Sequence, residues 1–195
     1  SAAFALTPIQ AWFFDQQQNT PQYWNQSLLL AVRQPLEPAR LAQALATLLQ
    51  RHSSLRLIFE QSAQGWQQRY QPLSADIAGK LLQVVEQPLD DALLEQWQQG
   101  WQLDRAPLIH WVYFTGSGHL LCTAHHLLVD AVSWQVLLEE LESLYLDPQA
   151  ALPAVSTSFH GWSGALQQHR QAAEVLAQRD YWQAQLAEEG EVARD

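Results

Sequence analysis

The sequence predicts an α+β fold in which helices pack on a mixed β-sheet. Two observations lead to this class: β-rich runs and amphipathic helical segments alternate irregularly along the chain, and short polar or glycine-containing turns join several of the β-rich runs as hairpins. The chain has 195 residues, of which 48% are hydrophobic. This is enough to bury a core in one domain or two small ones, and it argues against disorder.

The first half of the chain is predicted to form a strand, a helix and a hairpin. Residues 24–32 form the strand, whose second half is continuously apolar and therefore buried on both faces. Residues 36–51 form an amphipathic helix with Pro38 in its first turn and leucines at helical spacing. Residues 55–60 and 65–71 flank a short polar turn, which is typical of a hairpin.

The most regular part of the second half is a hairpin followed by a helix. Residues 108–114 and 119–124 are β-rich, and the glycines of Thr115-Gly-Ser-Gly118 allow the positive φ angles of a tight turn between them. Over residues 132–146 the apolar period changes from two to that of a helix. Asp130 stands where it would cap this helix.

The remaining segments give weaker patterns. Residues 80–86 are predicted as a further strand. Residues 90–101 are predicted as a helix with its N-cap at Leu89 or Asp90. Helical sequence is predicted again from about 159 to 187.

Composition excludes several classes of function. Ten Lys and Arg stand against 20 Asp and Glu, the formal net charge is −10, and Lys80 is the only lysine. A sequence-independent nucleic-acid binder needs cationic side chains, and so does a protein that binds an anionic membrane surface.

The single cysteine, Cys122, excludes an internal disulfide and a cysteine-rich zinc module, and it fits a reducing compartment. With no run of eighteen apolar residues and no basic N-terminal region, we expect neither a membrane span nor a signal peptide, and a cytoplasmic protein.

The segment His125-His-Leu-Leu-Val-Asp130 is the one that could carry chemistry, because it stands at a predicted strand-to-helix junction. Strand and helix fix the backbone there, while the loop between them can direct side chains into a cavity. Two adjacent residues at a strand end point to opposite sides, so at most one histidine faces a given pocket. An imidazole titrates near neutral pH and can therefore move a proton in either direction.

Other interpretations of these residues stay open. His125 and His126 could be hydrogen-bonded core residues, with Asp130 no more than a helix cap. A zinc site formed by His125, His126 and Asp130 lacks the i, i+4 histidine pair of helical zinc enzymes. A Ser133 nucleophile lacks the Gly-x-Ser-x-Gly turn. Cys122 stands inside an apolar strand and is predicted to pack rather than to react.

At these residues the sequence resembles a known family. His125-His-x-x-x-Asp130 is similar to the signature of the condensation-domain superfamily of nonribosomal peptide synthetases, which is related in fold to chloramphenicol acetyltransferase. Three further segments, 6–14, 51–56 and 180–182, resemble the opening motif, the Arg-His-x-x-Leu-Arg motif and the segment that closes the first lobe. The four segments follow one another in the family's order and span the chain nearly end to end. The resemblance implies a chloramphenicol-acetyltransferase-like lobe, half of a two-lobed fold.

Within the superfamily, the sequence resembles the epimerization branch more than the peptide-bond-forming branch. The start Pro8–Phe13 and the segment Trp24-Asn-Gln-Ser27 are similar to those of epimerization domains. So is Val132-Ser-Trp134 running into Leu137–Leu141, where condensation domains usually show a different order after the aspartate. Ala131 stands where the family most often has glycine, which adds a methyl group near the expected cavity.

The resemblance implies an isomerase activity, the interconversion of L and D configuration at Cα of an aminoacyl or peptidyl thioester on a carrier protein. His126 would serve in one of the two proton transfers, and His125 would support the local structure. Asp130 would hold the loop together with an arginine, for which Arg56 is the candidate.

Four further side chains have expected positions in this arrangement. Ser133 and Trp134 are candidate substrate-binding residues that pack or form local hydrogen bonds rather than react. Trp12 and Trp24 are expected to be structural. No metal ion is expected.

The resemblance also implies that the active site extends beyond this chain. The family's second acid/base group is a glutamate of a second lobe, and residues 188–195 form only a polar tail or the start of a linker after a lobe of residues 1–187. We therefore expect residues 1–195 alone not to epimerize efficiently. No cofactor would be bound by the chain itself, since 4′-phosphopantetheine is carried by the partner. The expected partners are a peptidyl carrier protein, the C-terminal lobe and adjacent synthetase domains.

Two alternatives to an epimerization domain remain. The first is a condensation domain, in which the same histidine would assist the attack of an amine on a thioester. The second is a catalytically silent relative that docks a partner protein, for which Ala131 is the one hint in the sequence.

Overall fold

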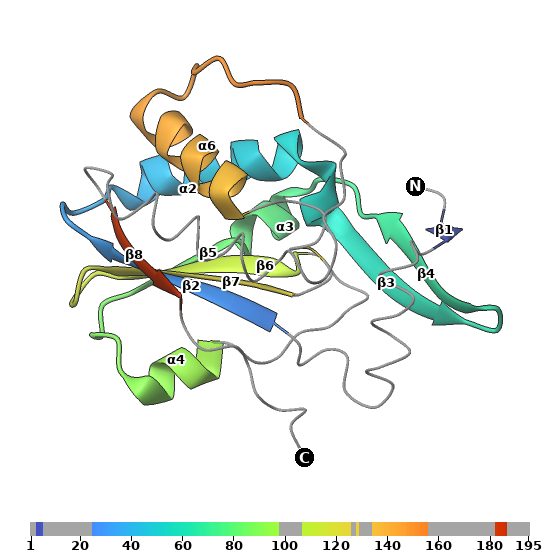
Figure 1. The fold of residues 1–195 in the computed structure, drawn as a ribbon, viewed down its shortest axis with the longest axis horizontal. Coiled ribbons are helices and arrows are strands. Elements are labelled where there is room, and N and C mark those ends of the chain that lie inside the picture. Colours follow the sequence, from blue (N-terminus) through green and yellow to red (C-terminus); the bar gives the residue numbers. More distant parts are fainter. Residues whose placement is uncertain are drawn as a thin grey trace.

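The computed structural model describes residues 3–5, 25–97, 107–125, 128, 134–155 and 182–186, with residues 25–26 and 182–186 described by their backbone alone. In this part of the chain a five-stranded sheet lies between a pair of long helices on one face and a short helix on the other (Figure 1). A separate three-stranded sheet lies to one side. The predicted α+β class, with helices packed on a mixed sheet, is confirmed.

The five-stranded sheet has the strand order β5-β6-β7-β2-β8. Its strands are β2 (Asn25–Val32), β5 (Leu82–Val85), β6 (Ile109–Phe114), β7 (His119–His125) and β8 (Trp182–Leu186). The β5–β6 pair is parallel and the other three pairs are antiparallel, so the sheet is mixed. The predicted hairpin of β6 and β7 is confirmed, and so are the predicted strands that correspond to β2 and β5.

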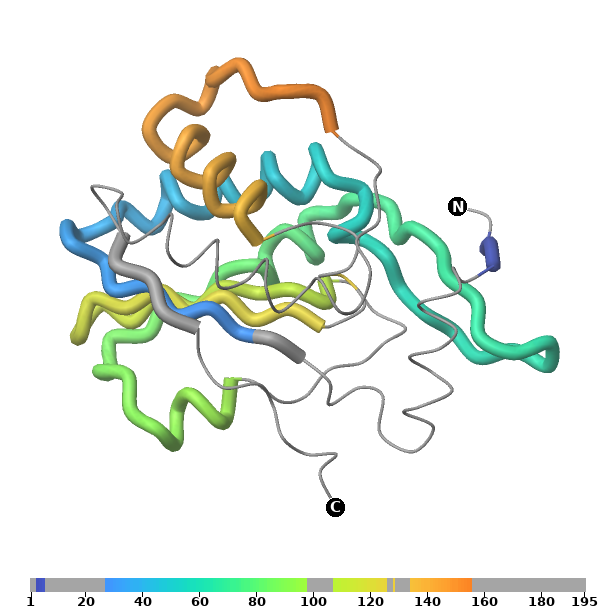
Figure 2. Tube along the Cα trace, viewed as in Figure 1, coloured from blue at the N-terminus to red at the C-terminus, as the bar shows by residue number. Residues whose placement is uncertain are grey.

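The second sheet is built on the predicted hairpin of β3 (Leu57–Ser62) and β4 (Gly65–Tyr70), which is confirmed. The short strand β1 (Phe4–Ala5) pairs with the outer edge of β4, giving the order β1-β4-β3. Arg69 and Glu60 form a bidentate pair across the hairpin, with N···O distances of 3.2 and 3.0 Å. The hairpin extends away from the five-stranded sheet (Figure 2).

Helices α2 (Pro38–Arg51) and α6 (Trp134–Leu146) cover one face of the five-stranded sheet (Figure 1). Pro38 begins α2, as predicted, and the helix buries one stripe of residues: Leu41, Ala44, Leu45, Leu48 and Leu49. The short helix α4 (Asp91–Trp97) covers the other face. The Leu93 N–H donates to Asp90 Oδ1 over 2.8 Å, so the predicted N-cap at Asp90 is confirmed.

Alternation along the strands gives the sheet two separate apolar faces. The side chains of Leu120, Cys122 and Ala124 join the larger core with α2 and α6, while Leu121 packs toward α4 with Val112 and Phe114. Leu28 and Leu30 face the larger core and Leu29 the smaller one, which confirms that β2 is buried on both faces. Cys122 is fully buried, and burial raises the pKa of its thiol well above the usual 9.0. Its predicted role in packing is confirmed.

Three elements differ from the sequence-based expectations. The 3₁₀ helix η2 (Ser53–Arg56) and the short helix α3 (Ala75–Gly79) were not predicted, although Ser74 caps α3 by accepting the Ile77 N–H. The helix predicted to run to residue 187 is wrong at its end, because residues 182–186 form β8. The reason is tertiary: β8 pairs with the edge of β2 and satisfies backbone groups that a helix there would leave unpaired. Residues 156–181 and 187–195 lie outside the described part of the chain.

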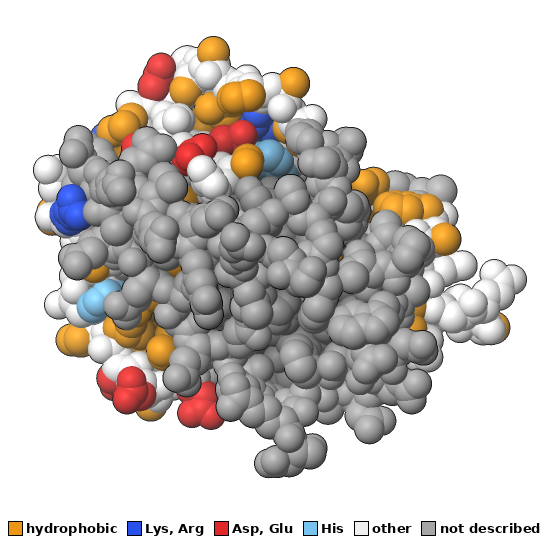
Figure 3. All heavy atoms as spheres, viewed as in Figure 1, with side chains coloured by type: hydrophobic (Ala, Val, Ile, Leu, Met, Phe, Trp, Pro, Cys, Tyr) orange, Lys and Arg blue, Asp and Glu red, His pale blue; other side chains and the backbone are white. Residues whose placement is uncertain are grey.

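Surface charge follows the composition on the face that Figure 3 shows. Acidic side chains of the described residues gather at the top of this view and at its lower left. Apolar side chains are exposed at the top, where α6 and the segment after it include Val136, Leu146 and Val155, each 40% or more exposed. Apolar residues exposed singly are normal on a soluble surface and indicate no function by themselves.

Glycine is required at two positions of the β6–β7 turn, for different physical reasons. Gly118 has a φ of 68°, as the sequence predicted, whereas Gly116 is not among the positive-φ residues. At Gly116 the backbone of residues 86–88 approaches closely, and a Cβ there would overlap with the Glu86 carbonyl oxygen. Gly116 therefore allows the β5–α4 connection to pass against the turn.

His110 connects the sheet to α4. Its Nε2 donates to the Trp97 carbonyl over 2.8 Å, and the two rings meet edge to face with their centroids 6.1 Å apart. Burial lowers the pKa of His110 to about 4, against a smaller opposite effect of the hydrogen bond to Trp97. His110 is therefore neutral at pH 7 and carries its proton on Nε2.

We predict that Gly116→Ala destabilises the chain by about 1–3 kcal/mol, because the added methyl group must displace backbone. Gly79→Ala is the matched control, since a Cβ at Gly79 meets nothing within 4 Å. The control should change the free energy of unfolding by less than about 1 kcal/mol. Urea denaturation measures both values, and equal stability of the two variants would contradict the close approach.

We predict a pH-dependent contribution from His110. Between pH 6.5 and about 4 the unfolded chain binds a proton that the folded chain excludes, so stability falls as the pH falls through this range. The full effect is about 3 kcal/mol from the 1.36 kcal/mol per pKa unit. The stability advantage of the wild type over His110→Gln, measured by urea denaturation, should shrink by this amount from pH 7 to pH 4. Parallel pH curves for the two proteins would contradict the lowered pKa of His110.

Candidate functional site

The histidine-containing motif lies at a strand-to-helix junction. His125 is the last residue of β7, and α6 begins at Trp134, so residues 126–133 connect this strand to this helix. Leu128, within the connection, is 1% exposed and belongs to the larger core. The predicted junction is therefore confirmed.

Several predicted site residues lie outside the described part of the chain. These are His126, Asp130, Ala131 and Ser133, and the same holds for Trp12, Trp24 and the opening segment 6–14. Their assigned roles stay predictions. The described residues around them show how the junction is held at each end.

His125 is fully buried at the end of β7. Its backbone N–H donates to the Leu108 carbonyl over 2.9 Å, and its backbone is paired with Asn25 of β2. Strand alternation places its side chain on the α4 side of the sheet, the side to which Leu121 and Thr123 belong. The strand end from which the motif starts thus lies between β2 and the residue that precedes β6.

A row of polar side chains crosses the sheet next to His125. Ser27, Thr123 and His110 are direct neighbours on β2, β7 and β6. The Ser27 and Thr123 hydroxyls are 3.0 Å apart and both are buried. Such a row fixes the strand register, because a slip by one residue would place these polar groups in the apolar core. The sequence contains a signal for this row, because its polar residues stand singly within apolar strands. The row was nevertheless not predicted.

Trp134 anchors the other end of the motif connection. It is the first residue of α6, is 1% exposed and packs in the larger core between the sheet and the two long helices. Its assignment as a substrate-binding residue stays a prediction. Its burial holds this part of α6 in the larger core.

Arg56 bonds to backbone rather than to a described carboxylate. Its Nε donates to the Leu49 carbonyl over 3.2 Å and its Nη1 to the Gln71 carbonyl over 3.4 Å. Arg56 thereby links the end of α2 to the residue after β4. The predicted pair of Arg56 with Asp130 stays a prediction.

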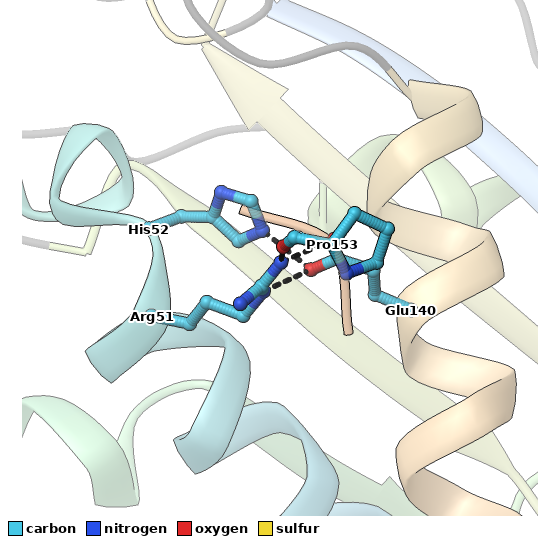
Figure 4. A network of polar contacts seen from close by, with 4 residues as sticks. All are labelled: Arg51, His52, Glu140 and Pro153. Atoms are coloured by element: carbon cyan, nitrogen blue, oxygen red, sulfur yellow. Dashed lines mark hydrogen bonds and ion pairs between the residues drawn. The ribbon is translucent and has the colours of Figure 1, made fainter. Parts of the chain in front are cut away.

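A cluster of polar side chains joins α6 to the end of α2 (Figure 4). Arg51 donates to Glu140 through both Nε (2.8 Å to Oε1) and Nη2 (3.2 Å to Oε2). His52 Nε2 lies 2.7 Å from the same Oε1. Arg51 Nη2 also donates to the Pro153 carbonyl. We call these four residues the Glu140 cluster.

The Glu140 cluster is largely removed from water. The side chains of His52 and Glu140 are 4% and 9% exposed, and that of Arg51 is 20% exposed. Burial by itself raises the pKa of Glu140, but the hydrogen bonds from Arg51 and His52 outweigh it, and the net pKa is lowered. Glu140 is therefore a carboxylate at neutral pH. The sequence motif contained Arg51 and His52, yet no pattern linked them to a residue 89 and 88 positions away.

The opposite ends of the two helices are bonded as well. Arg40 donates to the Tyr145 carbonyl over 2.6 Å, and its guanidinium lies 4.5 Å from the centre of the Tyr145 ring. The Tyr145 hydroxyl accepts the Glu37 N–H over 2.9 Å. α6 is thus attached to α2 near both ends of α2.

Two further structural findings concern the described residues alone. Within them, no three His, Cys, Asp or Glu side chains come together in a group able to hold a metal ion. None of the helices in the described ranges is long and apolar enough to cross a bilayer.

Comparison with curated proteins finds long peptide synthases. The chain is 37% identical over 194 residues to a linear gramicidin synthase of Brevibacillus parabrevis, covering 91% of this chain and 4% of that protein. It is 31% identical to a surfactin synthase of Bacillus subtilis strain 168, covering 94% of this chain and 6% of that protein. The chain thus spans only a small fraction of these relatives.

Comparison with solved structures finds two kinds of related domain. The epimerization domain from the third module of a tyrocidine synthetase superimposes with a TM-score of 0.69 at 28% identity, over 90% of this chain and 43% of that one. The starter condensation domain of rhizomide synthetase gives a TM-score of 0.56 at 20% identity, over 88% of this chain and 44% of that one, and this likeness concerns the fold alone. The chain spans less than half the length of either domain, and it has the fold of a chloramphenicol-acetyltransferase-like lobe.

The family model of the condensation domain matches residues 1–194, almost the whole chain. The motif recognised in the sequence stands at the strand-to-helix junction that the hydrophobic pattern predicted. The chain belongs to the condensation-domain family of nonribosomal peptide synthetases.

Proposed function

We propose that the chain is the N-terminal lobe of an epimerization domain, which interconverts L and D configuration at Cα of an aminoacyl or peptidyl thioester. The observation that carries this proposal is the likeness to the tyrocidine synthetase epimerization domain, with 28% identity and a TM-score of 0.69 against 20% and 0.56 for the starter condensation domain. The order of residues Val132–Leu141 after the motif aspartate supports the same branch.

The reaction needs two proton transfers. A base removes the weakly acidic proton α to the thioester carbonyl, which leaves an enolate, and a proton then returns to the opposite face of the same carbon. We assign one of these transfers to His126. An imidazole suits this role because its ordinary pKa is close to cellular pH.

The surroundings of His125 support the assignment of the proton transfer to His126 and not to His125. His125 is fully buried at the end of β7, on the side of the sheet that carries α4. We assign it to support of the strand end. The enolate oxygen also requires hydrogen-bond donors, which we assign to the rest of the domain together with the second proton-transfer group.

The partners follow from the same proposal. The thioester would be presented on the 4′-phosphopantetheine arm of a peptidyl carrier protein, so this chain holds no cofactor of its own. The C-terminal lobe would complete the site, since the chain covers 43% of the related epimerization domain. Adjacent domains of a cytoplasmic synthetase would deliver and remove the substrate.

Peptide-bond formation is the second candidate function. It is favoured by the family match itself and by relatives such as the linear gramicidin synthase. In that reaction His126 would assist the attack of an amine on the thioester. A silent docking domain, suggested by Ala131, is the third.

We predict that the complete two-lobed domain exchanges the Cα proton of an L-aminoacyl or L-peptidyl thioester on its carrier protein. In D2O the product should gain one deuterium at Cα and become a mixture of L and D forms, measured by mass spectrometry and chiral chromatography. His126→Ala should slow this exchange by about a hundredfold or more, the usual contribution of a positioned acid/base group. His119→Ala, on the β6–β7 hairpin, is the control and should keep the wild-type rate.

The alternatives give other results in this experiment. Peptide-bond formation with an added acceptor, without Cα exchange, would overturn the proposal in favour of a condensation domain. A wild-type domain with neither activity would favour the silent docking domain.

We also predict that residues 1–195 alone give no exchange above background, because the second proton-transfer group would be missing. The measurement is the same deuterium uptake, with circular dichroism to establish that the lobe is folded. Rapid exchange by the folded lobe would show that it contains every group the reaction needs.

A further inference from the structure

We propose that residues 147–155, which we call the strap, open and close over the two long helices as a unit, and that Arg51, oriented by Glu140, holds the strap closed. The strap follows α6 and turns back over α2 and α6 (Figure 2). Neither the sequence motif nor the family match assigned a role to this segment. The proposal does not depend on which reaction the domain catalyses.

The strap begins with a tight turn at the end of α6. The Ala150 N–H donates to the Asp147 carbonyl over 2.9 Å, and the Gln149 N–H donates to Asp147 Oδ1 over 2.9 Å. Aspartate followed by proline is typical of such a turn, because the carboxylate accepts from the backbone two residues later and proline fixes its own φ. The turn reverses the chain, so the strap runs back along the two helices.

The strap extends from one end of α2 to the other. Where it begins, Arg40 in the first turn of α2 donates to the Tyr145 and Leu146 carbonyls. Near its far end, Arg51, the last residue of α2, donates to the Pro153 carbonyl. Arg40 and Arg51 are about 16 Å apart along the helix axis, at 1.5 Å per residue. The two arginines therefore contact the chain at the two ends of this path.

The far half of the strap has no regular structure of its own. Residues 151–155 form neither helix nor strand, and all of them except the half-buried Leu152 are exposed. Leu152 packs against the larger core, and the next residue, Pro153, accepts the bond from Arg51. A segment with few buried contacts and an exposed backbone opens locally at a small cost in free energy. The contacts of Leu152 and Pro153 are therefore the ones that oppose opening.

Glu140 orients Arg51 toward the strap. An arginine side chain that is free to move samples many rotamers, and ordering it costs entropy. Arg51 donates to Glu140 through both Nε (2.8 Å) and Nη2 (3.2 Å), and such a planar bidentate pair sets the direction of the guanidinium. The bond from Nη2 to the Pro153 carbonyl then requires little further ordering of Arg51.

The Glu140 cluster is rigid on its inner side and exposed on its outer side. His52 Nε2 lies 2.7 Å from Glu140 Oε1, and both side chains are buried, so water competes little for the bonds between them. Pro153, the outer member, lies in the exposed strap. When the cluster breaks, we therefore expect the strap to separate from Arg51 before Arg51 and His52 separate from Glu140.

The test measures how often the strap opens in the complete two-lobed domain. Leu152→Cys places a thiol at the half-buried position, and its alkylation by iodoacetamide is followed by mass spectrometry of the peptide that contains it. Ala154→Cys, at an exposed position of the strap, gives the rate for an accessible thiol. Cys122 is fully buried in the larger core, so its alkylation reports opening of the lobe as a whole.

We predict that the thiol of Leu152→Cys is alkylated more slowly than that of Ala154→Cys, because the closed strap protects it. Adding Glu140→Gln should raise the rate at Leu152→Cys about tenfold, which is the effect of losing one hydrogen bond from a charged donor. Glutamine keeps the shape of the side chain but presents an N–H2 group to Arg51, so the bidentate pair is lost.

Glu60→Gln is the matched control in the same background. Glu60 also forms a bidentate pair with an arginine, Arg69, but in the β3–β4 hairpin. It should change the alkylation rate at Leu152→Cys by less than about twofold. Where Glu140→Gln does not fold, Arg51→Lys takes its place with the same expected rise, since it keeps the charge and loses the bidentate geometry.

Three results would overturn the proposal. Equal rates at Leu152→Cys and Ala154→Cys, without any other change, would show that the strap is not closed. A rate at Leu152→Cys that Glu140→Gln changes by less than about twofold would show that Arg51 and Glu140 do not hold it. Alkylation of Cys122 that rises by the same factor would show that Glu140 stabilises the whole lobe instead. The readout needs no substrate, so it is independent of the proposed function.

Discussion

The carboxylate of Glu140, bonded to Arg51 and His52, joins the two long helices over the sheet. Of the described residues, it is the one carboxylate among the buried ones. Its charge is stable because the hydrogen bonds outweigh the cost of burial, as the lowered pKa indicates. Together with the contacts of Arg40 to Tyr145, it attaches α6 to α2 at two separate points. The helix that follows the histidine motif is therefore held by directional bonds as well as by apolar packing.

The five-stranded sheet separates two kinds of surroundings for the motif strand. On the side of α2 and α6 the strand contributes Leu120, Cys122 and Ala124 to an apolar core. On the side of α4 the polar row of Ser27, Thr123 and His110 crosses the sheet before His125. Burial acts in opposite directions on the two titratable groups involved, raising the pKa of Cys122 and lowering that of His110, but both stay neutral. The motif thus starts from a strand that is paired with β2 on one edge and with β6 on the other.

Local patterns predicted those elements whose cause is local. The helix from Pro38, the hairpin turns and the N-cap at Asp90 were correct because proline, glycine and aspartate act on their own backbone or on neighbouring residues. The change of apolar period from two to that of a helix predicted the strand-to-helix junction correctly. The helix predicted over residues 182–186 was wrong, because these residues form β8 instead. The pairing of β8 with β2 depends on an edge supplied by residues about 150 positions earlier in the chain. The roles of His126, Asp130 and Ser133 rest on the resemblance alone.

The sequence by itself determined the fold class, the family and the place of the histidine motif, because periodicity, turn residues and motif order are written along the chain. Only the tertiary structure decided which distant groups meet. The folded chain places Arg51 and His52 beside Glu140. It also aligns Ser27 with Thr123 and His110 across the sheet. At position 116 glycine is required because the Glu86 carbonyl lies too close for a Cβ. The physical reason is that hydrogen bonds and steric contacts act over a few ångströms, and the order of the strands in the sheet sets which residues come that close.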